Sequence, residues 1–166
     1  MLFGCGVSGE KRAEAKIQSK NKSAVAGQAV FLEKNGKVKI EISLTGAGPG
    51  PIAVHLHRVG DCSAEDATTS GGHWNPTQEN HGKWGEPPFH SGDIGNIKID
   101  ESGKGRLTLI DEHNRWSIGG PSKTNLIGRA VVVHQGKDDM ISQPSGAAGK
   151  RTGCGPIIEV TSSTEK

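Results

Sequence analysis

Three histidines and one aspartate lie close together in a segment of this chain that is poorly suited to regular structure. Residues 71–96 hold His73, His81, His90 and Asp93 among many glycines and prolines. This composition disfavours both a helix and a central strand, and it leaves little apolar material to hold the loop in one conformation. Three imidazoles and one carboxylate form a suitable tetrahedral ligand set for zinc. The sequence therefore predicts a zinc-binding loop in this segment.

Three further histidines belong to predicted strands. His55 and His57 are two residues apart, so both side chains point to the same face of their strand and can reach one ion. His134 follows the apolar residues 131–133, where a second strand opens into a loop. One zinc ion does not need six histidines and an aspartate, whereas two metals that share a ligand would use them all. His113 is then left over and is interpreted as a surface residue.

The strands that position these histidines are indicated by alternating apolar and polar residues. Residues 38–44 alternate in this way, and Asn35-Gly36 in front of them predicts a hairpin with residues 25–33. No stretch has helical periodicity, so about eight antiparallel strands in a sandwich or barrel are expected. The other predicted strands are 15–20 (as an edge strand), 52–58, 95–100, 106–111, 127–134 and 155–160.

Two long connections, at residues 60–94 and 135–152, separate these strands. Long ordered loops in a compact domain usually carry function, so the fold is predicted to be all-β with two functional loops. The 166 residues suit one domain, and 25 glycines with no tyrosine favour a turn-rich β fold. A net charge of +2 and the lack of a basic block argue against nucleic acid. No apolar run approaches the roughly 20 residues that a membrane span needs.

Three cysteines give information about the chain ends and the compartment. Met1-Leu2-Phe3-Gly4-Cys5 looks like the end of a bacterial lipoprotein signal, so Cys5 is either lipidated or an exposed thiol. Residues 1–14 are predicted to be a tether or signal remnant, and residues 15–166 the β domain. Cys62 and Cys154 form either a long-range bridge, which would indicate an oxidising compartment, or two buried free thiols.

Five motifs follow one another along the chain. They are Val54-His55-Leu56-His57, Gly72-His73-Trp74-Asn75-Pro76, Phe89-His90-Ser91-Gly92-Asp93-Ile94-Gly95-Asn96, Val131-Val132-Val133-His134 followed by Asp138-Asp139, and Gly149-Lys150-Arg151-Thr152-Gly153-Cys154-Gly155. In these motifs and their order the chain resembles the copper/zinc superoxide dismutases, particularly bacterial ones. The similarity runs from about residue 15 to residue 160 and implies an eight-stranded antiparallel Greek-key barrel.

The resemblance implies a ligand set and a role for each site residue. His73 would bridge two ions, and Asp138 would orient His55 and His81 from behind. Arg151 and His73 would be the catalytic residues, the first attracting the anion and the second delivering a proton. The implied copper ligands are His55, His57, His73 and His134, and the implied zinc ligands are His73, His81, His90 and Asp93. A disulfide between Cys62 and Cys154 is implied as well.

The reaction implied by the resemblance is the disproportionation of superoxide to dioxygen and hydrogen peroxide, an antioxidant activity with copper and zinc as cofactors. It implies a periplasmic or other extracytoplasmic protein, with a lipid anchor if Cys5 is modified. Family members occur as monomers and as dimers, so a homodimer is one expected assembly.

Two other functions compete with the enzyme. A non-catalytic copper/zinc-binding module of the same fold is the main alternative, although such relatives typically lose copper ligands or the arginine that Arg151 matches. A zinc hydrolase is the third, and it is disfavoured because the chain has no His-Glu-x-x-His helix.

Overall fold

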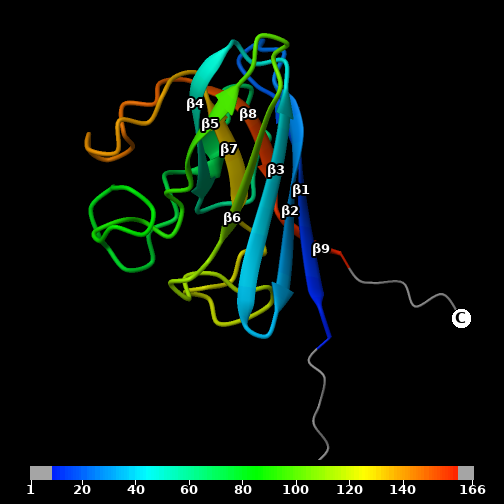
Figure 1. Cartoon of the computed structure of the whole chain (residues 1–166), viewed down its shortest axis with the longest axis vertical. Coiled ribbons are helices and arrows are strands. Elements are labelled where there is room, and N and C mark those ends of the chain that lie inside the picture. Colours follow the sequence, from blue (N-terminus) through cyan, green and yellow to red (C-terminus); the bar gives the residue numbers. More distant parts are fainter. Residues whose placement is uncertain (1–8, 161–166) are drawn as a thin grey trace, which may run out of the picture.

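Strands make up almost all the regular structure of residues 9–160, the part of the chain that the computed structural model describes (Figure 1). One 3-10 turn, η1 (Thr68–Ser70), and no α-helix is present in this range, and none of it can span a membrane as a helix. The strands are β1 (Lys11–Ser19), β2 (Ala26–Lys34), β3 (Lys37–Thr45), β4 (Gly50–His57), β5 (Gly95–Ile99), β6 (Gly105–Ile110), β7 (Ala130–His134), β8 (Arg151–Pro156) and β9 (Ile158–Val160).

The strands close into a barrel. Their order in the sheet is β2-β3-β6-β5-β4-β7-β8-β1-β9, and the additional pairing of β1 with β2 closes the ring. Strand β8 and the short β9 pair with different parts of β1 and together occupy one position, so the ring has eight strands. All pairings between strands are antiparallel. The connection after β6 passes β5 and β4 and places β7 on the far side of β4, which is the Greek-key arrangement. The predicted fold class is confirmed.

The hairpin at Asn35-Gly36 is confirmed too. Lys34 pairs with Lys37, and the two residues between them have φ values of 52° and 74°. These left-handed conformations are those of a type I′ turn, whose twist matches that of paired strands. In β3 the side chains of Val38, Ile40, Ile42 and Leu44 point into the core, where none is more than 1% exposed.

The structure corrects three sequence-based boundaries. β1 begins at Lys11, so residues 11–14, which the sequence placed in the tether, belong to the barrel. β1 has partners on both sides and is not an edge strand. β8 begins at Arg151, inside the loop predicted for residues 135–152, and ends at Pro156, where the missing N–H interrupts the run before β9. Cys5 lies outside the described residues.

Both long loops lie on one side of the barrel (Figure 1), where residues 58–94 (green) leave β4 and residues 135–150 (orange) leave β7. Along β4 the side chains of Val54 and Leu56 belong to the apolar core. Because side chains alternate along a strand, His55 and His57 point outward, beneath these loops. The barrel therefore presents histidines to the space that the loops cover.

Candidate metal centre

The outward-facing histidines of the two adjacent strands meet a histidine from the first long loop. His55 and His57 on β4, His134 at the end of β7 and His73 in the loop bring one nitrogen each to within 4.8 Å of one another. The centroid of the His55 ring lies 4.0 Å from that of His73 and 4.9 Å from that of His134. His55, His57 and His134 are at most 4% exposed. The sequence-based grouping of these four residues is thus borne out.

Each of these four rings has one nitrogen with no hydrogen-bond partner. The unpaired atoms are Nδ1 of His55 and Nε2 of His57, His73 and His134. The opposite nitrogens are occupied, since His57 Nδ1 lies 2.8 Å from the Gly71 carbonyl and His134 Nδ1 lies 3.2 Å from the Gly149 carbonyl. Buried polar atoms normally have partners. Four convergent unpaired imidazole nitrogens therefore fit a copper ion.

The loop residues form a second cluster around Asp93. The Nδ1 atoms of His73, His81 and His90 lie 2.9, 2.9 and 3.1 Å from Asp93 Oδ1. In a tetrahedron with metal–ligand distances of about 2.0–2.1 Å, neighbouring ligands are about 3.3–3.4 Å apart. The predicted zinc set therefore has nearly the spacing that a bound ion requires. His73 belongs to both clusters, with Nδ1 in one and Nε2 in the other.

Asp138 joins the two clusters from behind. Its fully buried carboxylate contacts His55 Nε2 at 2.8 Å and His81 Nε2 at 2.9 Å. The side chain of Asn96 holds the backbone of Asp138 in turn. The Asp138 N–H donates to Asn96 Oδ1 (2.8 Å), and Asn96 Nδ2 donates to the Asp138 carbonyl (3.0 Å). One carboxylate thus contacts a copper-type and a zinc-type ligand at once, as the sequence-based role for Asp138 requires.

Burial and neighbouring charges give the metal-free centre unusual ionisation. Burial lowers the pKa of His73 to about 4 and that of His134 to about 3, so both rings are neutral near pH 7. Burial alone would lower the pKa of His81, but hydrogen bonds to Asp138 and Asp93 outweigh this effect and raise the pKa to about 9. Burial alone would raise the pKa of Asp93, but its contacts with three imidazoles hold this pKa well below the usual range. A metal that binds at this cluster near pH 7 therefore finds Asp93 anionic and His73 neutral, and it must displace the proton of His81.

Arg151 stands beside the copper cluster and is held by the start of the first long loop. Its Nη1 donates to the Ala67 carbonyl (2.7 Å) and to Ser70 Oγ (3.1 Å). That part of the loop is tied to β8 by the disulfide between Cys62 and Cys154, whose Cα atoms are 5.7 Å apart. The disulfide implied by the resemblance is present.

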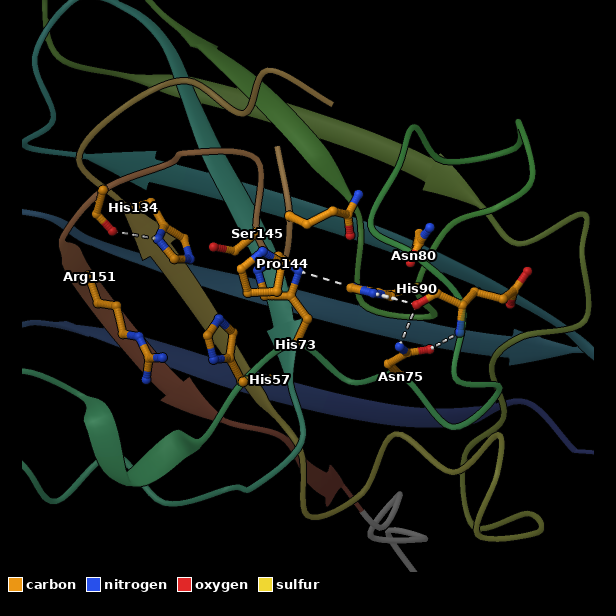
Figure 2. Close-up of a pocket in the computed structure, with 13 residues that line it drawn as sticks. His57, His73, Asn75, Asn80, His90, His134, Pro144, Ser145 and Arg151 are labelled. Atoms are coloured by element: carbon orange, nitrogen blue, oxygen red, sulfur yellow. Dashed lines mark hydrogen bonds between the residues drawn. The ribbon is translucent and has the colours of Figure 1, made fainter. Parts of the chain in front are cut away.

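A pocket of about 580 Å³ opens over the two clusters. His57, His134 and Arg151 line one end of it, His73 its middle, and His90 with Asn75 the other end (Figure 2). Pro144 and Ser145 from the second long loop form part of its wall. A small anion that enters this pocket can reach the arginine and the unpaired imidazole nitrogens together.

Two polar side chains that support the zinc-type ligands were not predicted from the sequence. Gln143 Oε1 accepts from His81 N–H at 2.8 Å, and its Nε2 donates to the His81 carbonyl at 2.9 Å, so the second loop is fastened to a ligand of the first. Asn96 fastens Asp138 in the same way. His113 is exposed, as predicted, although its ring packs edge-on against Trp84 and Phe89.

The fold and the site define a class of protein: an antiparallel barrel with two adjacent metal sites that share one histidine, one suited to copper and the other to zinc. The family described as copper/zinc superoxide dismutase (SODC) matches residues 25–157. Superoxide dismutase [Cu-Zn] 1 of Aquifex aeolicus (strain VF5) is 32% identical over 161 residues, which cover 95% of this chain and 94% of the relative.

Two further relatives agree. The superoxide dismutase [Cu-Zn] of Paramecium bursaria Chlorella virus 1 is 36% identical over 140 residues, 80% of this chain and 72% of the viral one. The crystal structure of the clock protein EA4 has 34% sequence identity and a TM-score of 0.77, over 95% of this chain and 98% of EA4. The chain belongs to the copper/zinc superoxide dismutase family. With its metal-site residues intact, it is an enzyme of that family, with copper and zinc as cofactors and superoxide as substrate.

Proposed function

We propose that Arg151 and His73 carry the superoxide chemistry of this chain, with Arg151 receiving the anion and His73 delivering a proton from Nε2. Copper, when bound, alternately accepts and donates one electron, and zinc fixes the loop without a redox role. Two superoxide anions and two protons then yield one dioxygen and one hydrogen peroxide. The observation that carries the proposal is the arginine on the wall of the pocket that the unpaired nitrogens also reach.

Arg151 suits an anion because its position is fixed and, among residues 9–160, no carboxylate forms an ion pair with it, Asp66 acting on it only through space. Nη1 is engaged by Ala67 and Ser70, and no other hydrogen bond of this guanidinium involves the described part of the chain. Its Nε and Nη2 can therefore receive a small oxyanion. Burial lowers the pKa of Arg151 without discharging it, because a guanidinium stays protonated throughout the physiological range.

His73 suits proton delivery because it lies between the two clusters and is neutral when metal-free. Its Nδ1 is held by Asp93 at 2.9 Å, while Nε2 faces His55, His57 and His134 without a partner. A ring fixed by one nitrogen can take up and release a proton at the other. Asp138 assists by orienting His55 and His81 through their Nε2 atoms.

The test is superoxide consumption by protein loaded with copper and zinc, followed by pulse radiolysis at several ionic strengths. Arg151→Ala should lower kcat/KM by about 10-fold or more and weaken its salt dependence, since a local cation typically raises the on-rate by that much. Lys150→Ala, an exposed neighbouring cation, is the matched control and should stay near the wild-type value. Metal-loaded wild type without dismutation would favour a non-catalytic metal-binding module instead.

We further propose an extracytoplasmic location with a lipid anchor at Cys5. The disulfide supports an oxidising compartment, and the motif around Cys5 supports lipidation. Radiolabelled palmitate should enter the protein expressed in its own host and be absent from Cys5→Ser. A protein that is unlabelled and found with cytoplasmic markers would contradict both parts. A homodimer stays a prediction, which sedimentation equilibrium of the holoenzyme tests.

A further inference from the structure

We propose that Arg115 is a positioning residue for the zinc half of the centre, because it holds the carbonyl of Glu79 against the zinc ligand His90. The proposal rests on the function above only in taking zinc as the ion of the Asp93 cluster. Arg115 lies in the connection between β6 and β7, far from the histidine motifs in the sequence. Its side chain is 17% exposed, and that of Glu79 is 25% exposed.

The carbonyl of Glu79 decides which nitrogen of His90 can bind a metal. His90 Nε2 lies 3.0 Å from the Glu79 oxygen, and His90 Nδ1 lies 3.1 Å from Asp93 Oδ1. A carbonyl can only accept, so this contact requires a hydrogen on Nε2 and leaves Nδ1 to face Asp93 and the zinc. With zinc bound, Nδ1 can give its lone pair to the ion because Nε2 carries the hydrogen. If the carbonyl moved away, the ring would lose this contact and could turn, and Nδ1 would be held less firmly at the zinc position.

Glu79 is held at both its backbone and its side chain. Asn75 Oδ1 accepts from the Glu79 N–H at 3.0 Å, and Asn75 Nδ2 donates to the Glu79 carbonyl at 2.8 Å (Figure 2). The carboxylate receives two hydrogen bonds from Arg115, Nη1 to Oε2 (2.5 Å) and Nη2 to Oε1 (3.2 Å). Two parallel bonds to a carboxylate fix direction as well as distance. Arg115 also donates to Thr77 Oγ1 at 3.0 Å.

The same connection holds the residues on either side of His90. The Arg115 guanidinium lies over the ring of Phe89, 4.6 Å from its centroid. The next residue, Trp116, donates from Nε1 to the Ser91 carbonyl at 2.7 Å and stacks on Trp84 at 4.5 Å. Neighbouring side chains of one connection therefore contact the residue before His90, the residue after it, and Glu79. This fixes His90 from outside its own loop.

His90 and His81 thus have independent supports. His81 Nε2 is held by Asp138 and its backbone by Gln143, both from the second long loop. His90 depends on Glu79 and Arg115. Loss of Arg115 should loosen one ligand and leave the other in place, so zinc should bind more weakly without being abolished.

The experiment compares zinc affinity, by competition with a chelator, in the copper-loaded full chain. Arg115→Met keeps the length of the side chain but removes the donors. Arg106→Met is the matched control, since it replaces an exposed arginine whose side chain makes no hydrogen bond in the described structure. Partners behind a ligand typically contribute 10–100-fold to metal affinity. We expect a loss of about 10-fold or more in Arg115→Met, a smaller loss in Arg115→Lys, and no loss in Arg106→Met.

Glu79→Gln tests the same contact without changing Arg115, and it should weaken zinc in the same direction. The two losses should not add in the double variant. Imidazole ¹⁵N NMR of the zinc-loaded protein should show a slowly exchanging Nε2–H of His90 in wild type and faster exchange of that hydrogen in Arg115→Met. A zinc affinity within twofold of wild type in both variants would overturn the proposal, even if the melting temperature of the metal-free protein fell. Zinc binding is measured without superoxide, so a failure of dismutation is a separate result.

Discussion

The two halves of the metal centre are built in different ways. Three copper-type ligands stand on barrel strands, where the register of β4 against β7 (His55 opposite Val132, His57 opposite Ala130) sets their positions. The zinc-type ligands stand in residues 73–93, outside any strand, where the Asp138 side chain holds His81 and the Glu79 carbonyl holds His90. A strand pair thus positions the copper-type ligands directly. The loop ligands instead depend on contacts with other residues and on a bound ion.

This difference indicates which half of the centre needs its metal ion in order to fold. The copper half has backbone hydrogen bonds and the apolar core behind it, including Val54, Leu56 and Val133. The zinc half has Asp93, whose buried charge holds three imidazoles in one place. Zinc is therefore expected to contribute folding free energy to the loop, while copper binds to a surface that exists without it.

The largest expected effect comes from removing Asp93. Loss of a buried, fully paired charge typically costs 3–5 kcal/mol, so Asp93→Ala should lower zinc affinity by roughly 10²–10⁴-fold. Hydrogen exchange should become faster in residues 71–93 and stay slow in β4 and β7. His134→Ala is the converse variant, and it should lose copper while residues 71–93 stay protected. Equal loss of protection in both halves after either change would contradict the distinction.

A smaller effect is expected from the disulfide, which joins the loop to the barrel. Cys62→Ser with Cys154→Ser should lower the free energy of unfolding by about 2–4 kcal/mol, measured by denaturant unfolding. Activity should fall as well, since Ala67 and Ser70 would hold Arg151 less firmly. A metal-loaded double variant with wild-type activity would show that Arg151 needs no help from the loop.

The smallest effect is a pH dependence that differs between the halves of the metal-free protein. In the copper half, burial lowers the pKa of His134 to about 3, below the ordinary 6.5, so stability is lost as the pH falls below about 6.5. In the zinc half, the pKa of His81 is about 9, because its contacts with Asp138 and Asp93 outweigh burial. Its stabilisation is present below 6.5 and is lost as the pH rises towards 9.

Unfolding free energies of the metal-free protein should therefore peak near pH 6.5. A change of one pH unit to either side should cost about 1 kcal/mol for each such histidine. His134→Asn should make the loss on the acid side smaller by the share of one histidine, since the pKa of His73 stays low, and should leave the alkaline side unchanged. A curve that rises steadily from pH 5.5 to pH 8.5 would disprove the opposite titration of the two halves.

The sequence predicted the ligands better than the contacts behind them. His55 and His57 follow from a two-residue spacing, and the zinc-type set follows from polar ligands in a glycine-rich loop. The contacts of Glu79 with Arg115 and of His81 with Gln143 join irregular segments 36 and 62 residues apart. No periodicity marks such pairs, because neither partner lies on a regular element.

The boundary errors have a physical cause as well. β1 buries Ala13 and Ala15, and its other early residues are charged, so its apolar face gives little hydrophobic signal. β8 contains Gly153 and Gly155, which pack closely against Ile17 and the backbone of Lys16. Glycine weakens the pattern of a strand while allowing this close approach. The bounds of β1 and β8 are therefore set by tertiary packing, which local sequence propensity does not contain.

Closure of the barrel through β1 has a consequence for folding during synthesis. Gln18 pairs with Cys154, and Arg12 pairs with Val160, so β1 finds these partners 136 and 148 residues further along the chain. Such non-local pairing slows folding. At about 5–20 residues per second, β1 waits roughly ten seconds or more until these partners are made. The barrel therefore closes only after β8 and β9 have been synthesised.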